Sequence, residues 1–401
     1  MLIYNYIIAS ILFLIFINFI VNIILFKNIK NYSLPDDVLR NPPLISILIP
    51  ARNEELNIKR CVNSLRKQDY KNIEILVLND NSIDNTAAIV EEISLKDSRV
   101  KLINGAPLKK GWLGKCWACF QLSKYAKGDF LIFTDADTLH YRDTVSKAFA
   151  ALLKNKLDGI SVYPKQISVT FHERMTVPFI NFAILSFMPL VLVKYAKGGF
   201  FSTGIGQFFM FKKDVYEKMG GHESVKSEIL EDIHLSKQIK KCGFRYLVFN
   251  GSKNIYCRMY NNFSEVVNGF TKFIYAAFNY NGFMEFLAVT AFSVFFLFPF
   301  LLLPLNLLIY GLSNIIITIN VIQILLILAI KAILYMKFKG RVLDSLLMPI
   351  STTYMLLIAV NSYVKAKSKK GLYWKGRSYN VKNVDEENEI GLIKDYHNIK
   401  Y

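Results

Sequence analysis

The longest apolar stretches of the sequence lie toward its two ends, and the first of them predicts a membrane helix. Residues 2–26 carry no charged side chain, and a helix of that length is long enough to cross a hydrocarbon core of about 30 Å. A cleaved signal peptide is the alternative, but the stretch is longer than the apolar part of such a peptide, and lysine and asparagine follow it instead of small residues. We therefore predict a membrane anchor over residues 1–30.

The second apolar region predicts further membrane helices. Residues 284–310 and 315–336 are two apolar runs separated by a short polar break, a pattern that favours a helical hairpin through the membrane. A weaker run, residues 342–364, contains an acidic residue and a proline, and it either spans or re-enters. We predict a C-terminal membrane region of two to three helices over residues 284–364 and a basic cytosolic tail over residues 365–401.

Between these regions the pattern changes to that of a soluble domain, which we place at residues 40–280. Four short apolar runs are each followed by a stretch with helical spacing. Such runs predict strands buried on both faces, and their alternation with helices predicts a parallel sheet with right-handed crossovers. The predicted strands are residues 45–50, 73–78, 100–103 and 129–134, and the predicted helices are residues 54–68, 84–95, 115–126 and 142–153. The fold class is therefore α/β, with a mainly parallel, Rossmann-like sheet and transmembrane helices on either side of it in the sequence.

Composition excludes several classes of protein. With 53% apolar residues the chain is not disordered, and five cysteines in 401 residues do not make a disulfide-stapled domain. Cys116 and Cys119 have the spacing of a metal site, but a second pair is missing, so we predict that they pack in the core. The net charge of +18 is typical of nucleic-acid binding, yet no such motif accompanies it. We expect no nucleic-acid partner, and assign the charge to membrane orientation and anionic headgroups.

Acidic residues follow three of the predicted strands, at the sheet edge where α/β proteins bind ligands. Glu54 follows the first strand, Asp80 the second, and Asp135 and Asp137 the fourth. Asp80 has the alternative interpretation of a turn residue, and Asp84 is interpreted as a helix cap. Asp135 and Asp137 would repel one another unless a cation lies with them, and such hard oxygen ligands suit Mg²⁺ or Mn²⁺ carrying a diphosphate.

Five motifs, in this order, resemble the family-2 inverting glycosyltransferases with a GT-A fold. They are PARNEE at 50–55, LNDNSIDNT at 78–86, GWLGK at 111–115, AKGDFLIFTDADT at 126–138 and EILEDIHL at 228–235. The GWLGK form, together with WKGRSY at 374–379, is similar to the membrane-attached branch that glycosylates lipids, including hopanoid-associated and carotenoid-ester glycosyltransferases.

The resemblance implies a role for each matching residue. The nucleotide sugar would be held by Ala51, Arg52, Asn53, Glu54, Asp80, Lys115 and Asp135, the metal by Asp135 and Asp137, and the catalytic pair would be Glu231 and Asp232. Within that pair, Asp232 matches the general base that deprotonates the acceptor. Gly206 and Gln207 match the loop on the acceptor side, for which a turn between elements is the other interpretation.

The implied reaction moves one sugar from a nucleotide sugar, with UDP as the family default, to a hydroxyl, phosphate or carboxylate oxygen of a lipid. Processive polysaccharide synthases of the family carry QxxRW, whereas residues 268–273 here read NGFTKF, which favours transfer of a single sugar. A polysaccharide-forming transferase, an inactive membrane scaffold and a transporter built on the apolar segments are the alternatives.

The predicted site also constrains the membrane topology. Residues 176–193 are uncharged, but a crossing there would separate Asp135 and Asp137 from Asp232, so we predict an interfacial helix that seats the domain on the lipid. The basic residues after the first span place the domain in the cytoplasm of a multi-pass protein of the cell membrane. The lysines on either side of residues 342–364 leave the side of the C-terminus open.

Overall fold

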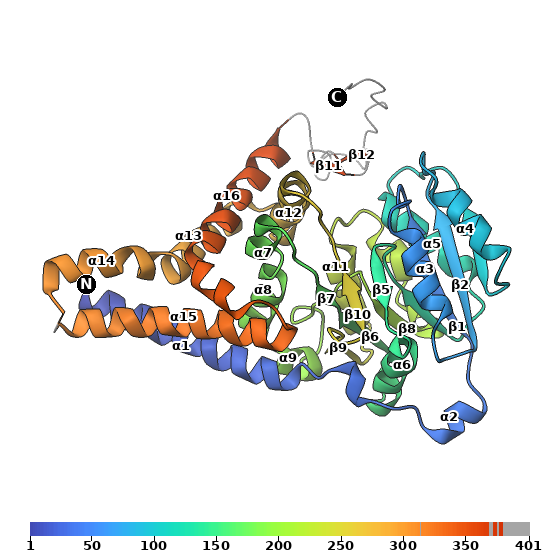
Figure 1. Ribbon diagram of the computed structural model, residues 1–401, viewed down its shortest axis with the longest axis horizontal. Coiled ribbons are helices and arrows are strands. Elements are labelled where there is room, and N and C mark those ends of the chain that lie inside the picture. Colours follow the sequence, from blue (N-terminus) through green and yellow to red (C-terminus); the bar gives the residue numbers. More distant parts are fainter. Residues whose placement is uncertain (313, 369–371, 375–376, 380–401) are drawn as a thin grey trace. The chain divides into compact units, whose positions relative to one another are not determined.

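The computed structural model describes residues 1–312, 314–368, 372–374 and 377–379, and it divides into two compact units (Figure 1). The α/β unit comprises Phe26–Ile167 and Leu190–Met259. The helical unit comprises Met1–Leu25, Ser168–Pro189 and the chain from Tyr260 onward. The predicted soluble domain of residues 40–280 is therefore interrupted, because two of its segments pack with the apolar helices instead.

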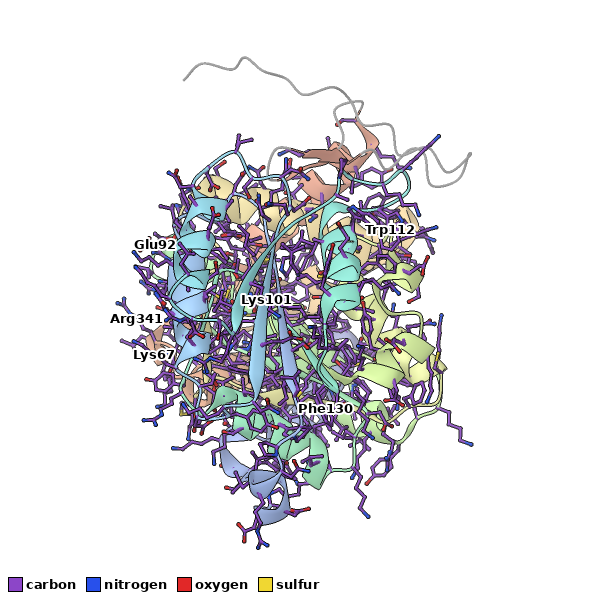
Figure 2. All side chains as sticks on the ribbon, turned by 90° about the vertical axis from the view of Figure 1, so that its right-hand side faces the viewer. Lys67, Glu92, Lys101, Trp112, Phe130 and Arg341 are labelled. Carbon is purple, nitrogen blue, oxygen red and sulfur yellow. The ribbon has the colours of Figure 1, made fainter. Side chains whose placement is uncertain are left out.

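A seven-stranded sheet forms the centre of the α/β unit, in the order β3-β2-β1-β4-β8-β6-β9. Its strands are β1 (Ile45–Ala51), β2 (Ile73–Asn79), β3 (Val100–Asn104), β4 (Phe130–Phe133), β6 (Gly159–Tyr163), β8 (Phe209–Lys212) and β9 (Tyr246–Asn250). The strands β3, β2, β1 and β4 are parallel, as the alternating pattern predicts, whereas β8 runs antiparallel to both β4 and β6. Figure 2 views the sheet from its β3 edge, where Lys101 is labelled.

The predicted helices cover this sheet. They are α3 (Ile58–Arg66), α4 (Thr86–Ser94), α5 (Gly114–Tyr125) and α6 (Thr144–Lys154), and the unit also contains α2 (Asp36–Arg40), α9 (Leu190–Tyr195), α10 (Lys213–Lys218), α11 (Glu231–Lys241) and the 3-10 helices Ile29–Asn31 and Gly221–Val225. A smaller sheet joins β5 (Thr138–His140), β10 (Ile255–Cys257) and β7 (Lys165–Gln166). Asp84 accepts hydrogen bonds from the backbone N–H and the hydroxyl of Thr86, so it caps α4 as predicted.

The helical unit contains α1 (Leu2–Leu25), α7 (Phe171–Thr176), α8 (Phe179–Phe187), α12 (Phe263–Ala277), α13 (Gly282–Phe296), α14 (Phe298–Tyr310), α15 (Ile315–Phe338), the 3-10 helix Val342–Leu347 and α16 (Met348–Lys367). Within the described residues, three helices are long and apolar enough to cross a membrane, or up to four if the bent pair α13–α14 is one span. That pair bends by 46° just before Pro299, which lacks the N–H that a continuous helix needs.

The uncharged stretch 176–193 differs from the single helix that we predicted. Pro178 and Pro189 flank α8, and α9 begins a new helix at Leu190. The α8 helix packs within the helical unit, where Asn22 of α1 donates hydrogen bonds to the backbone oxygens of Leu185 and Met188 at 2.8 and 2.7 Å. Its position at a lipid interface stays a prediction.

Most of the predicted basic tail, residues 365–401, lies outside the described residues. The described part includes the end of α16 and two short strands, β11 (Leu372–Trp374) and β12 (Arg377–Tyr379), which pair antiparallel.

Candidate active site

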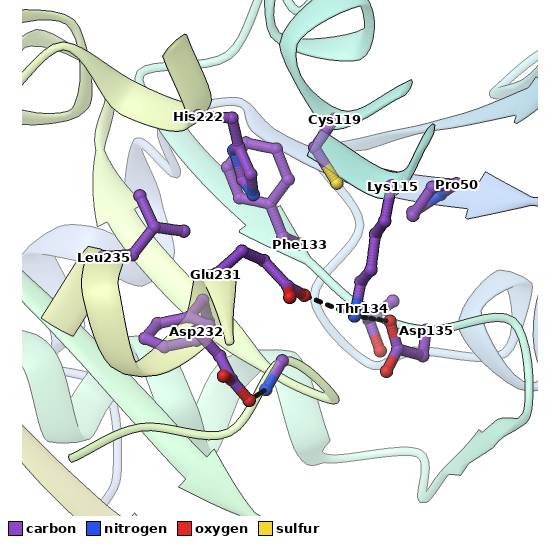
Figure 3. Close-up of a pocket in the computed structure, with 12 residues that line it drawn as sticks. Pro50, Lys115, Cys119, Phe133, Thr134, Asp135, His222, Glu231, Asp232 and Leu235 are labelled. Carbon is purple, nitrogen blue, oxygen red and sulfur yellow. Dashed lines mark hydrogen bonds and ion pairs between the residues drawn. The ribbon is translucent and has the colours of Figure 1, made fainter. Parts of the chain in front are cut away.

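The carboxyl ends of β1 and β4 and the first turns of α5 and α11 surround a cavity of about 260 Å³. The residues that line it are Pro50, Lys115, Cys119, Phe133, Thr134, Asp135, Gly206, Phe209, His222, Glu231, Asp232 and Leu235 (Figure 3). The cavity brings together five residues that the sequence predicts for the site, although they come from segments far apart in the chain.

Lys115 crosses this cavity and bridges its two acidic walls. Its ammonium lies 2.7 Å from Oδ1 of Asp135 and 2.9 Å from Oε1 of Glu231, as the dashed lines in Figure 3 show. Burial on its own would lower the pKa of Lys115, but the charges of Asp135 and Glu231 outweigh burial and raise this pKa well above its usual value. The lysine therefore stays positively charged at neutral pH and holds the two carboxylates in place.

Asp232 follows Glu231 in the first turn of α11 and is held by two backbone donors. The N–H of Gly206 donates to its Oδ2 at 3.0 Å, and the N–H of Ile233 donates to its Oδ1 at 2.8 Å. Burial and the negative charge of Glu231 raise the pKa of Asp232 to about 7, against the opposing effects of Lys115 and the two N–H groups. A carboxyl group with this pKa exchanges its proton near neutral pH, as a general base requires.

Gly206 is confined by the same charged groups. A Cβ atom at this position would lie 2.8 Å from the Lys115 ammonium and 3.3 Å from Oε1 of Glu231. A side chain would therefore displace the bridge. The packing gives a physical reason for glycine at a position that the sequence assigns to the acceptor side.

The loop that carries Asp135 and Asp137 is held by a buried polar network beneath it. The hydroxyl of Thr138 donates to the backbone oxygen of Asp135 at 2.7 Å, and the hydroxyl of Thr134 donates to the backbone oxygen of Gln207 at 2.7 Å. His140 lies between these hydroxyls, with Nε2 at 3.2 Å from that of Thr134 and 2.9 Å from that of Thr138. Sequence patterns alone did not single out this histidine.

Burial, and then the negative charges of Asp137 and Asp135, raise the pKa of the Cys257 thiol well above its usual value. Within the described residues there is no group of three or more His, Cys, Asp or Glu side chains that could hold a metal. A pair of carboxylates nevertheless fits Mg²⁺ or Mn²⁺, because such ions commonly take one or two protein carboxylates and complete their shell with substrate phosphates and water.

The two loops that the sequence assigns to the nucleoside are joined to one another. Arg52 donates from Nη1 to the backbone oxygens of Asp80 and Asn81 at 2.8 and 3.2 Å, and the N–H of Asp80 donates to the backbone oxygen of Ala51 at 2.8 Å. Asn53, which has a positive φ of 51°, accepts at its side chain from the N–H of Ile83 at 3.0 Å.

Glu54 is buried beside these loops. Its N–H donates to the hydroxyl of Thr86 at 2.8 Å, and its Oε2 accepts from Asn57 at 3.0 Å. The ends of β1 and β2 therefore form one stiff wall that presents polar backbone and side-chain groups.

Gln207 does not direct its side chain into the cavity, unlike the other predicted residue of its loop. It is buried, its Oε1 accepts from Gln166 at 2.6 Å, and its Nε2 lies 3.0 Å from Sγ of Cys257. Its side chain supports the loop from below. The acceptor-side assignment is therefore better placed on Gly206 alone.

The cavity also contains residues that the sequence left unassigned. His222 lines the wall next to Glu231, with its Nδ1 2.8 Å from the hydroxyl of Tyr216, and burial lowers the pKa of His222 to about 3. Cys119 lines the cavity while Cys116 contacts the backbone oxygen of Val225, and both are buried in α5, as predicted. The GGH sequence at 220–222 drew attention to His222, but it did not indicate that the side chain points into the cavity.

The mixed α/β fold, with a mostly parallel central sheet and acidic residues at the strand ends, is of the GT-A type. Residues 46–220 match the family model "Glycosyl transferase family 2", in agreement with the resemblance that the motifs indicate.

Two similar proteins carry the name of a glycosyltransferase. The chain is 29% identical over 231 residues to the 4,4'-diaponeurosporenoate glycosyltransferase of Staphylococcus haemolyticus, covering 57% of this chain and 60% of that protein. It is 28% identical over 237 residues to the enzyme of the same name from Staphylococcus aureus, covering 58% and 61%. The matched region thus spans about three fifths of these relatives.

The fold is similar to that of a mannosyltransferase from Pyrobaculum calidifontis in complex with GDP-Man and Mn²⁺. The TM-score is 0.50 and the identity 17%, over 89% of this chain and 98% of that one.

Proposed function

We propose that the protein is a membrane-bound inverting glycosyltransferase that moves one sugar from a nucleoside-diphosphate sugar, with UDP as the default, to an oxygen of a lipid acceptor. The observation that carries the proposal is the arrangement of the cavity. Lys115 bridges Asp135 and Glu231 across it, and Asp232, with a pKa raised to about 7, follows Glu231 at the start of α11. The family match and the names of the relatives support the reaction class and the lipid-like acceptor.

In this mechanism Asp232 accepts the proton of the attacking hydroxyl while the oxygen displaces the nucleoside diphosphate from the opposite face of the anomeric carbon. The Gly206 N–H keeps the carboxylate oriented at 3.0 Å. Lys115 provides positive charge toward the leaving diphosphate, and the joined loops after β1 and β2 hold the nucleoside. Asp135 and Asp137 would hold the divalent cation, which acts as a Lewis acid for the leaving phosphate when bound.

The acceptor is proposed from the relatives. Both act, by name, on diaponeurosporenoate, a carotenoid acid, and the apolar helices would keep a transferase at the bilayer where such a lipid dissolves. The acceptor of this chain is therefore a lipid with a hydroxyl or acid oxygen at the bilayer surface. The stretch NGFTKF lies in α12, in place of the motif of processive synthases, and supports transfer of a single sugar.

Removal of the divalent cation tests the function directly. We expect the purified full chain in lipid nanodiscs to hydrolyse or transfer from one nucleotide sugar, to lose that activity with a chelator, and to regain it with Mn²⁺ or Mg²⁺. Asp135→Asn should lower the activity by about 10²–10³-fold, because a metal ligand and the charge paired with Lys115 are lost. Nucleotide release from UDP- and GDP-sugars is the measurement.

The matched control is Asp214→Asn, which changes an exposed carboxylate paired with Lys218 on the surface of α10. It should retain wild-type rates. Chelator-resistant activity, or equal loss in both variants, would contradict the metal-dependent proposal.

Hydrogen bonds within the helical unit support one arrangement of the membrane helices. A buried amide network joins α1, α14 and α15, with hydrogen bonds from Asn306 to Asn320 at 3.1 Å and from Gln323 to the backbone oxygen of Asn5 at 2.9 Å. Polar contacts of this kind join helices within membranes. We infer that α1, the bent pair α13–α14 and α15 are the spans.

The last helix, α16, is held differently. Asn361 donates to the hydroxyl of Thr271 in α12 at 2.9 Å, and Tyr354 lies 2.8 Å from Nδ1 of His172 in α7. In Figure 1 α16 runs across the direction of α1 and α15. We infer that α16 lies along the cytoplasmic interface with α12 and does not cross.

This topology predicts a cytoplasmic C-terminus. A C-terminal green fluorescent protein fusion should fluoresce, and a C-terminal alkaline phosphatase fusion should be inactive, because the even number of crossings after the α/β unit returns the chain to its side. Fusions after Tyr310 serve as the control and should show the reverse. An active phosphatase at the C-terminus would mean that α16 crosses.

A further inference from the structure

Residues 194–201, here termed the aromatic loop, expose large apolar rings on the α/β unit. Phe200 is 83% exposed and Tyr195 is 70% exposed, and Lys194 and Lys197 beside them are also exposed. The aromatic loop contains the end of α9 and leads directly to Gly206. It lies outside the motifs that the sequence assigns to catalysis.

The backbone of the aromatic loop is fixed on α11, the helix that begins with Glu231 and Asp232. A Cβ atom at Gly199 would lie 2.7 Å from the backbone oxygen of Lys237, so only glycine permits this contact. Just after the loop, the hydroxyl of Ser202 donates to the backbone oxygen of Ser236 at 2.6 Å. Phe200 stands between these two anchored positions. Its exposure therefore follows from the fold of the loop.

The chain also connects the aromatic loop closely to the helical unit. Pro189 is the last residue of that unit in this part of the chain, and α9 follows it immediately. At a rise of about 1.5 Å per residue, the six residues of α9 carry the chain only about 9 Å from Pro189 to the loop. Only this short helix separates the aromatic loop from that unit along the chain.

Exposed aromatic rings flanked by lysines fit one partner best, the headgroup layer of an anionic bilayer. Aromatic side chains are enriched at that level, and each lysine near such a surface gains attraction from anionic lipids. A second protein copy would also bury the rings, but it offers no reason for the lysines or for the short connection to the helical unit.

We propose that the aromatic loop inserts Phe200 and Tyr195 into the headgroup layer and thereby places α11, with the base Asp232, at the bilayer surface where a lipid acceptor enters. This inference rests on the proposed function for the role of the acceptor, whereas the membrane contact stands without it. The hydrogen bond from Ser202 to Ser236 and that from Gly206 to Asp232 transmit the position of the loop to the acceptor side of the cavity.

A depth measurement in full-length protein tests the membrane contact. The exposed Cys242 is first replaced by serine, which leaves four buried cysteines, and Phe200→Cys is then labelled with a fluorophore sensitive to polarity. In nanodiscs of anionic lipid we expect a blue-shifted emission that brominated lipids quench. The control is Leu95→Cys, at a residue that is 84% exposed after α4, whose label should respond to aqueous iodide but not to brominated lipid.

The outcomes of the measurement separate the possible partners. Quenching by iodide alone at position 200 would overturn the proposal. A label shielded from both iodide and brominated lipid would also overturn it, because such shielding indicates a protein partner. A wild-type chain that lacks transferase activity would refute the proposed function, while lipid quenching at position 200 would still establish the contact.

A second experiment measures the activity of the double variant Tyr195→Ser and Phe200→Ser. Transfer to a lipid acceptor in nanodiscs should fall by at least about fivefold, because the acceptor is presented less precisely, while hydrolysis of the donor should be unchanged. Leu95→Ser is the control for loss of an exposed apolar side chain. An equal fall in transfer and hydrolysis would show that the loop only supports the fold, and would contradict the role in acceptor entry.

Discussion

Replacing Asp232 with asparagine should reduce donor hydrolysis by about 10²–10⁴-fold, the usual contribution of a positioned general base. Water takes the place of the acceptor in this reaction, so the measurement does not depend on the identity of the lipid. Asparagine keeps an oxygen for the N–H of Gly206, which donates to Oδ2 at 3.0 Å, but it accepts no proton. The effect should therefore appear in kcat, with the donor KM changed little.

The pH dependence gives a second readout of the same group. Asp232 must be ionised to accept a proton, and burial and Glu231 raise its pKa to about 7. Wild-type kcat/KM should therefore fall about tenfold per pH unit below that pKa, and this limb should be missing in Asp232→Asn. Asp214→Asn, at an exposed position, should keep both the rate and the limb. A normal acid limb in Asp232→Asn would assign the base to another residue.

The alternating α/β pattern predicted the parallel half of the sheet because local signals define it. Strands β1 to β4 are nearly continuous apolar runs, and each is followed by a helix. The antiparallel strand β8 pairs with β4 and β6, and such pairing depends on partners distant in sequence. The division into two units could not be predicted from the sequence either. Residues 168–189 pack with α1 through side chains such as Asn22, and these side chains form no local pattern.

At the site, the sequence predicted which residues meet but not how they interact. The motifs predicted that Lys115, Asp135 and Asp232 share one site, because ligands bind where parallel strands end at one edge of the sheet. All three residues line the same cavity. The bridge from Lys115 to Glu231 also depends on the strands β8, β6 and β9, which local patterns did not predict. Gln207 was predicted to face the acceptor, yet it contacts Gln166 and Cys257, because the direction of a side chain in a loop is set by tertiary packing.

The bridge formed by Lys115 leads to the other prediction with a large expected effect on kcat. Lys115→Met keeps most of the side-chain volume but leaves Asp135 and Glu231 without the cation that lies 2.7 and 2.9 Å from them. We expect kcat to fall by about 10²-fold or more, as for other losses of a charge that stabilises a leaving group. Because Lys115 lowers the pKa of Asp232, the acid limb should move to higher pH. The affinity for Mn²⁺ should increase, since the ammonium no longer competes for Asp135.

Gly206→Ala tests the bridge without removing a charge. Its methyl group would lie 2.8 Å from the ammonium of Lys115 and 3.3 Å from Oε1 of Glu231, so the bridge must shift while all charged groups remain. The expected change has the same direction as in Lys115→Met but is smaller, about tenfold in kcat. Lys96→Met, at an exposed pair with Glu92, controls for the loss of a lysine and should leave kcat, the acid limb and Mn²⁺ affinity unchanged. If Lys115→Met lowers kcat while the acid limb and Mn²⁺ affinity stay at wild-type values, Lys115 acts on the diphosphate alone, and the bridge has no part in setting the protonation of Asp232.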